Sequence, residues 1–161
     1  MQITRSSIAT RTAPAEWFTG DVYVDAITAP TPPSRLRAAS VHFTPGARTA
    51  WHSHPVGQTI YVLEGIGRCQ RPGGRVEVIC PGDRVFFEPA EEHWHGAAPD
   101  RLMTHLAMLE VDEHGNSADW GEHVTDEEYT ASPDPAMLAR TEHVTRPYTR
   151  EDRDERADHQ K

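Results

Sequence analysis

Two short histidine pairs give this sequence its clearest chemical potential. His52 and His54 form one H-x-H pair, and His93 and His95 form another. In an extended strand alternate side chains point to the same face, so each pair is expected to present two imidazoles from Cα atoms about 6.5–7 Å apart. Two imidazoles at that separation can bind one ion from adjacent coordination sites, and such nitrogen ligands suit borderline divalent metals. The repeated spacing therefore predicts a metal site.

Gln58 extends the first pair. It follows a Pro-Val-Gly turn, and its side-chain carbonyl oxygen could complete a mixed nitrogen and oxygen ligand set. The alternative interpretation is that the histidines are half-buried strand residues that make structural hydrogen bonds. A single pair would not separate the two interpretations, whereas two pairs, each behind a glycine-containing turn segment, favour the metal.

The elements that must position these side chains are short strands. Between residues 21 and 112, apolar and polar residues alternate in runs such as DVYVDAIT and LRAASVHF, and turn signals such as RPGGR and PGD separate the runs. No long window in this region has a persuasive helical period. The region is therefore expected to be all-β, with the strand pattern of a sandwich or a barrel.

Alternation indicates which side chains face inward. Ala39, Val41 and Phe43 share one face of their run and, with Leu109, could line a pocket or belong to an ordinary core. The run RLMTHLAMLE, which contains His105, is apolar on both faces, so its orientation stays open from the pattern alone.

Length and composition favour one folded unit. The chain has 161 residues, 37% of them hydrophobic, which suffices for one sizeable core. We expect a domain over residues 1–129 and a polar tail over 130–161, where prolines and mixed charges leave few large apolar groups. The tail is expected to be flexible or to order against a second subunit, with a short helix over 135–141 as a further option.

The charge balance narrows the partners. A net charge of −9 disfavours nucleic acid, because phosphate binding needs a clustered positive field. The apolar runs are too short to span a bilayer and the N-terminus lacks an apolar signal segment, so we expect a cytoplasmic protein that acts on a small molecule, with no membrane partner. Cys69 and Cys80 are expected to be free thiols.

The first histidine segment resembles the first signature motif of the cupins, G-x5-H-x-H-x3-[E/Q]-x6-G. Residues 46–65 match it, with Gln58 in the position where glutamate is usual. Residues 82–97 resemble the second motif, G-x5-P-x-G-x2-H-x3-N, less closely: His93 takes the histidine position, whereas the proline, second glycine and asparagine positions hold Glu88, Ala90 and Ala97. The resemblance implies a cupin jelly-roll β-barrel, a fold that is usually dimeric.

A closer resemblance is to the small manganese-dependent cupin hydroxynitrile lyases, over about residues 17–129. The segments that carry it are EWFTG, GARTAWHSHPVGQT, EEHWHGAAP, MTHLAM and DWGEHVTDEEY. It implies one divalent metal per chain, manganese first and Fe, Ni, Co or Zn as alternatives, and a homodimer. The implied ligands are His52, His54, Gln58 and His93, with His95 as a possible substitute for His93. His95 and His105 would occupy the family's pocket positions.

This ligand set favours Lewis acid chemistry. Neutral ligands leave a divalent ion its full charge, which suits Lewis acid work better than one-electron chemistry with O₂. His95 and His105 are then the acid/base candidates, because a nearby cation keeps a histidine neutral and able to accept a proton. The specific expectation is cleavage or formation of a cyanohydrin. The alternatives are a quercetinase-like or thiol-type dioxygenase, which glutamate at position 58 would have favoured, and a non-catalytic cupin that binds a ligand through its metal.

Overall fold

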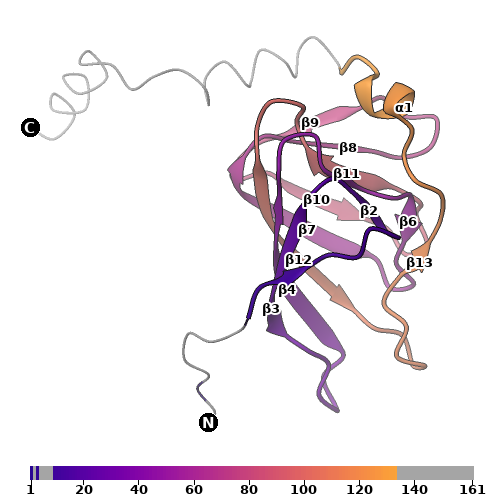
Figure 1. Ribbon diagram of the computed structural model, residues 1–161. Helices are drawn as coiled ribbons and strands as arrows, with labels where there is room; N and C mark the ends of the chain where they lie inside the picture. The colour runs from indigo at the N-terminus through magenta and orange to yellow at the C-terminus, as the bar shows by residue number, and fades with distance from the viewer. Residues whose placement is uncertain (2, 4–8, 134–161) are drawn as a thin grey trace, which may run out of the picture.

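The computed structural model describes residues 9–133 together with Met1 and Ile3, and nearly all of their regular secondary structure is β-strand (Figure 1). One short helix, α1 (Asp126–Thr130), follows the last strand. The strands are β1 (Arg11–Thr12), β2 (Phe18–Thr19), β3 (Val22–Thr28), β4 (Leu36–Phe43), β5 (Arg48–Thr49), β6 (His52–Ser53), β7 (Gln58–Gly65), β8 (Gly67–Gln70), β9 (Glu77–Ile79), β10 (Arg84–Phe87), β11 (Trp94–Ala97), β12 (Met103–Glu110) and β13 (Asp119–Trp120). The all-β prediction is confirmed. The expected helix over 135–141 and most of the expected tail lie outside the described residues.

Two antiparallel sheets form the barrel. The larger sheet has the order β1-β3-β4-β12-β7-β10, the smaller one has the order β2-β5-β11-β8-β9, and β13 pairs with β6 beside them. Non-consecutive neighbours such as β4-β12-β7 show that the chain crosses between the sheets several times rather than meandering. The RPGGR turn joins β8 to β9 in an antiparallel pair, as its glycines predicted.

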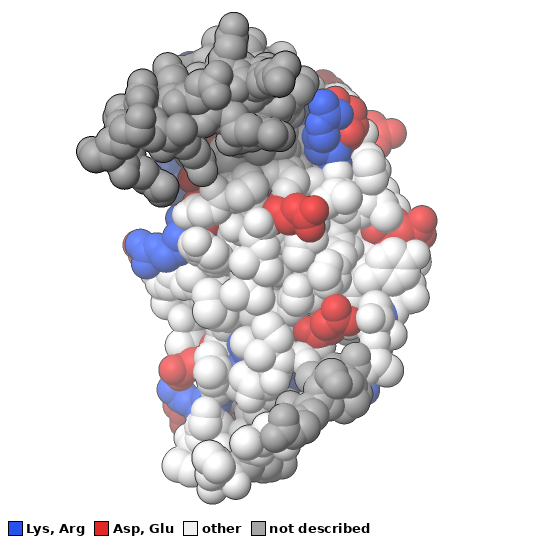
Figure 2. Space-filling view, turned by 90° about the vertical axis from the view of Figure 1, so that its left-hand side faces the viewer, with Lys and Arg blue, Asp and Glu red and all other residues white. Residues whose placement is uncertain are grey.

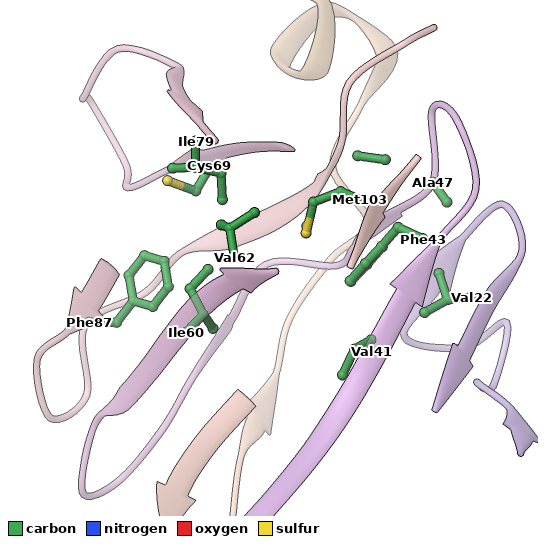
Figure 3. Packing of buried hydrophobic residues seen from close by; sticks show 11 residues of the cluster. Val22, Val41, Phe43, Ala47, Ile60, Val62, Cys69, Ile79, Phe87 and Met103 are labelled. Carbon is green, nitrogen blue, oxygen red and sulfur yellow. The ribbon is translucent and has the colours of Figure 1, made fainter. Parts of the chain in front are cut away.

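The hydrophobic core resolves the orientation of β12. In the register with β4, Met103 lies opposite Phe43 and His105 lies opposite Val41. Met103 and His105 are both fully buried, so the odd positions of this strand face inward. Core residues from both sheets meet between them (Figure 3). Apolar packing thus surrounds the inner face on which His105 lies.

Both cysteines are buried and neither forms a disulfide, as expected. Burial raises the pKa of the Cys69 thiol to about 12, because the thiolate is poorly solvated inside the core. Cys69 is therefore a packing residue at neutral pH.

Helix α1 was not expected from the pattern. Its signal is a capping box: the Thr125 hydroxyl accepts a hydrogen bond from the Glu128 backbone N–H, while the Glu128 carboxylate accepts one from the Thr125 N–H. Three acidic residues in its first turn complement the positive end of the helix dipole. A helix of five residues is too short to show a helical period in the sequence. The T-x-x-E spacing of the capping box is therefore the main sequence feature that indicates it.

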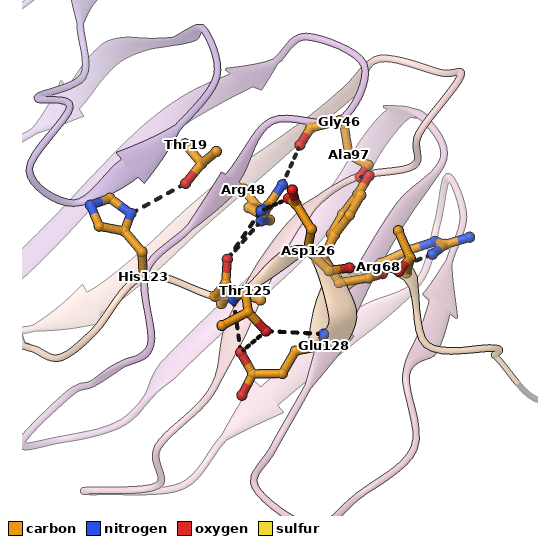
Figure 4. Close-up of polar contacts among 12 residues, drawn as sticks. Thr19, Gly46, Arg48, Arg68, Ala97, His123, Thr125, Asp126 and Glu128 are labelled. Atoms are coloured by element: carbon orange, nitrogen blue, oxygen red, sulfur yellow. Dashed lines mark hydrogen bonds and ion pairs between the residues drawn. The ribbon is translucent and has the colours of Figure 1, made fainter.

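Arg48 anchors the segment that ends in α1 (Figure 4). Its guanidinium, which is almost fully buried, donates to the Val124 carbonyl oxygen at 3.0 Å and to the Asp126 carboxylate at 2.7 Å. The same group lies 4.5 Å from the centre of the Tyr129 ring, and the Tyr129 hydroxyl donates to the Ala97 carbonyl oxygen at 2.7 Å. These contacts hold the segment of residues 112–131, called the strap below, against the smaller sheet.

Gly65, the last residue of the first motif, is expected to tolerate no side chain. It has a φ of +77°, and a Cβ there would clash with the Leu102 carbonyl oxygen. Gly65→Ala should therefore lower the free energy of unfolding by more than about 2 kcal/mol, because the cost of the strained backbone and the cost of the clash are added together. Gly46→Ala is the matched control, because Gly46 has a φ of +81° but open space around it. Equal losses in the two variants by denaturant unfolding would contradict this view.

The described residues contain no helix that is long and apolar enough to cross a bilayer. On the face shown in Figure 2, basic and acidic side chains are scattered over a mostly uncharged surface, and Lys and Arg do not gather into a patch.

Candidate metal centre

Six polar side chains that the sequence singled out are brought together inside the barrel. Each has an exposed fraction of 5% or less. The main chains of His52 and His93 are joined directly, since each N–H donates to the other's carbonyl oxygen at 2.9 Å. The six residues come from four parts of the fold. His52 lies on β6 and His54 just after it, and Gln58 begins β7. His93 immediately precedes β11, His95 lies on β11, and His105 lies on β12.

The imidazole rings lie within coordination range of one another. Ring centroids are 4.3 Å apart for His52 and His93, 5.0 Å for His52 and His54, and 5.5 Å for His54 and His93. One nitrogen from each of His52, His93 and His95 lies within 4.8 Å of the others. His54 is not in that tightest group of histidines, although the side chains of His54 and Gln58 line the same cavity as His52 and His95.

Backbone carbonyls fix the orientation of three of the rings. Nδ1 of His52 and Nδ1 of His93 each bond the carbonyl oxygen two residues earlier in the chain, at 3.0 Å and 2.8 Å. Nδ1 of His54 bonds the Ser117 carbonyl oxygen at 2.6 Å. Since a carbonyl accepts but cannot donate, these Nδ1 atoms carry the proton, and each Nε2 keeps a free lone pair. A histidine that ligates a metal through one nitrogen and donates through the other has this form.

Several buried acceptors have no partner among the described residues. They include Nε2 of His54, Nε2 of His93 and Oε1 of Gln58. A buried polar atom without a hydrogen bond costs about 1–3 kcal/mol, and the convergence of three such acceptors from separate elements fits the binding of a cation. Imidazole nitrogens and a carboxamide oxygen fit a divalent transition metal. His52, His54, Gln58 and His93 could hold such an ion.

His95 and His105 form a second group beside these residues. Their ring centroids are 4.9 Å apart with the planes nearly perpendicular. All four of their ring nitrogens lack a hydrogen-bond partner among the described residues, and both rings line the cavity. The His95 ring has no tie to a backbone carbonyl, whereas the Leu106 backbone acts on the pKa of His105. Both rings border the cavity, where they can exchange a proton with a bound molecule.

Burial keeps all five histidines neutral at pH 7. It lowers the pKa of His52 and His95 well below the ordinary 6.5, and it brings the pKa of His93 and His105 to about 4. Burial also lowers the pKa of His54, an effect that its hydrogen bond to the Ser117 backbone partly opposes. Neutral imidazoles are what both metal ligation and proton abstraction need.

A cavity of about 470 Å³ opens over this cluster. Its walls are largely apolar and include Val41 and Leu109, two of the residues expected to line a pocket. Ala39 is not in the lining, and Phe43 lies behind it, with its ring 5.5 Å from His105. The volume and the few converging polar groups are typical of a small-molecule site.

Sequence reasoning missed the contribution of the strap. The Trp120 ring stacks between the ring of His52, at 4.6 Å, and the ring of Trp17, at 5.1 Å. Strand β13 places Trp120 opposite His52, and Ser117 of the same strap fixes His54. Trp17 and Trp120 lie in segments that carry the family resemblance, and this resemblance was the only signal for them. The pairing of β13 with β6, which brings Trp120 to His52, could not be predicted from local sequence patterns.

The metal-free protein is expected to lose stability in mild acid. The pKa values of His93 and His105 are about 4 when folded and near 6.5 when unfolded, so the unfolded chain binds more protons between those values. Stability is therefore complete above pH 6.5 and falls as the pH drops toward 4, by on the order of 3 kcal/mol for each residue. Urea unfolding of chelator-treated protein at pH 7.5 and pH 5 measures this. A free energy of unfolding that does not change between them would contradict the burial argument.

Comparisons with known proteins agree with this geometry. Residues 39–109 match the family described as "Cupin domain". The chain is 55% identical over 130 residues, 80% of this chain and 98% of the relative, to a protein named (R)-mandelonitrile lyase from Granulicella tundricola. A cupin-like protein from Thermotoga maritima has a TM-score of 0.69 and 36% identity, over 77% of this chain and 93% of that one. The polyketide cyclase RemF from Streptomyces resistomycificus, at 18% identity and a TM-score of 0.60 over 80% of this chain and 89% of that one, shares the fold.

Proposed function

This chain belongs to the cupin family, and we propose that it is a metal-dependent hydroxynitrile lyase that cleaves or forms cyanohydrins. The observation that carries the proposal is the juxtaposition of two unlike histidine groups beside one cavity, which four of the five histidines line. His52, His54 and His93 offer lone pairs fixed by backbone carbonyls, whereas His95 and His105 are free to move protons. The 55% identity to a named mandelonitrile lyase supports the same reaction class.

The ligand set proposed is His52, His54, Gln58 and His93, with manganese as the first candidate. All four donors are neutral, so a bound divalent ion supplies Lewis acidity toward a hydroxyl, carbonyl or cyanide group. His95 lies in the tightest nitrogen group with His52 and His93, which makes it the alternative ligand. Removing each histidine separately distinguishes the two assignments.

The chain's own residues would carry the proton through the reaction. In the cleavage direction a neutral imidazole of His95 or His105 accepts the cyanohydrin hydroxyl proton. The O–H electron pair becomes the carbonyl bond as the C–C bond breaks, and the electrons of that bond leave with cyanide. The protonated histidine, or the N–H of its neighbour, then donates a proton to cyanide, which gives aldehyde and hydrogen cyanide. Burial supports this role, because it lowers the pKa of both rings and leaves them in the accepting form.

Apolar walls would hold the organic part of the substrate. Val24, Val41, Ala107 and Leu109 line the cavity beside the histidines. They restrict water around the reacting carbon, and a drier site strengthens the electrostatic contacts on which the proton transfer depends.

The test is metal analysis of protein purified without added metal, followed by assays with racemic mandelonitrile. We expect about one divalent ion per chain and release of benzaldehyde that a chelator abolishes and Mn²⁺ restores. Oxygen uptake with iron-loaded protein and flavonol or thiol substrates, in the absence of mandelonitrile cleavage, would instead support the dioxygenase alternative. Metal binding without any turnover would support a ligand-binding cupin.

A further inference from the structure

Arg37 places a positive charge at the far end of the histidine cavity. Strand β4 pairs with β12 so that Val41 lies opposite His105 and Arg37 lies opposite Leu109. All four side chains line the same cavity. Four strand residues separate the His105 level from the Arg37 level, a distance of about 13 Å. The cavity lining therefore extends from the buried proton-transfer groups to Arg37, an exposed residue.

The guanidinium has no committed partner. Its one hydrogen bond in the described structure is a long one, from Nη1 to the Ser117 hydroxyl at 3.4 Å, and it forms no ion pair with a described carboxylate. Nearby Arg35, just before the same strand, behaves differently and pairs with Glu110 at 3.0 Å. The acidic residue of the strap that lies nearest in sequence to Ser117 is Asp119. Its carboxylate is exposed and acts electrostatically on His54, and it forms no ion pair with Arg37.

The wall between the two ends suits an aromatic spacer. On β12, apolar Ala107 lies between the His105 level and the Arg37 level, and apolar Leu109 lies at the Arg37 level. The stacked rings of Trp17 and Trp120 border the same cavity. A flat, apolar group fits between such surfaces, with one polar end at the histidines and the other at the guanidinium.

We propose that Arg37 is a specificity-determining residue that binds an anionic group, a carboxylate, at the end of the substrate remote from the reacting carbon. The preferred substrates are then aromatic aldehydes and cyanohydrins that carry a ring carboxylate. This inference rests on the proposed lyase function for its reacting end. A guanidinium can donate two parallel hydrogen bonds to a carboxylate, a geometry that gives specificity as well as affinity.

Binding to the metal-loaded protein tests the proposal without requiring turnover. The probes are 4-formylbenzoate and benzaldehyde, each titrated by calorimetry in the absence of cyanide. Arg37→Gln should weaken 4-formylbenzoate binding by about tenfold or more and leave benzaldehyde binding unchanged, since only one probe has the carboxylate. Arg35→Gln is the matched control: it removes the same charge two residues away, outside the cavity lining, and should change neither dissociation constant.

The outcomes separate this proposal from the lyase assignment. Equal weakening of both probes in Arg37→Gln, or no weakening of either, overturns the role of Arg37. Equal effects of Arg37→Gln and Arg35→Gln on 4-formylbenzoate overturn it as well, because they indicate general electrostatics. A selective loss in a protein that does not cleave any cyanohydrin supports the carboxylate site while the lyase function fails.

Discussion

Replacing His52 with alanine is expected to remove the bound metal and essentially all turnover while the barrel remains folded. His52 lies at the centre of the cluster, with the rings of His93, His54 and Trp120 all within 5.0 Å of its own centroid. Its loss leaves an ion with too few fixed ligands. Even outer-sphere partners of metal ligands are worth about 10–100-fold in affinity, so a direct ligand should exceed that range. His54→Ala should have the same effect.

Metal content and folding must be measured together for this result to be informative. Elemental analysis after gel filtration gives the occupancy, and far-ultraviolet circular dichroism with thermal unfolding gives the state of the barrel. His114→Ala is the control, because His114 is an exposed histidine outside the cluster. Full occupancy in His52→Ala would remove His52 from the ligand set, and a collapsed barrel would show that the residue is mainly structural.

Most of the site was predictable because its signals are local. The H-x-H spacing puts both histidines of each pair on one strand face, and in the structure His93 and His95 are buried while Trp94 between them packs in a separate cluster with Tyr129. Gln58 begins the strand that follows the first pair. Period-two alternation also identified the inner positions of β4. Such features depend on residues a few positions apart, which is the range that a pattern can read.

The strap could not be predicted in this way. The bond from His54 to Ser117 spans 63 positions, and the partner atom is a backbone oxygen that every residue type possesses. Trp120 reaches His52 only because β13 pairs with β6, and a two-residue strand has no periodicity. Buried Arg48, which fixes the end of the strap, looks in the sequence like any surface arginine. Tertiary contacts alone give these residues their roles.

Replacing His105 with leucine is expected to lower kcat by about 10²- to 10⁴-fold, the usual contribution of a general acid or base, with the metal retained. His105 is fully buried and its ring nitrogens have no partner among the described residues, so a leucine of similar size can fill the space without leaving an unpaired group.

His95→Leu separates the two roles open to His95. Loss of metal would place it among the ligands with His52, whereas loss of turnover with full occupancy would make it a proton-transfer residue.

The acid stability of His105→Leu distinguishes catalysis from structure. The folded pKa of His105 is about 4, below the unfolded value near 6.5, so this residue costs stability as the pH falls between those values. Metal-free His105→Leu should therefore lose less stability than the parent protein on going from pH 7.5 to pH 5, by on the order of 2 kcal/mol. We expect His105→Leu to be more stable in acid, to bind the metal and to have lost cyanohydrin turnover. This combination would show that His105 serves proton transfer and that it lowers the stability of the protein in acid. If turnover persists in such a variant, His105 is a core residue and His95 must carry the proton alone.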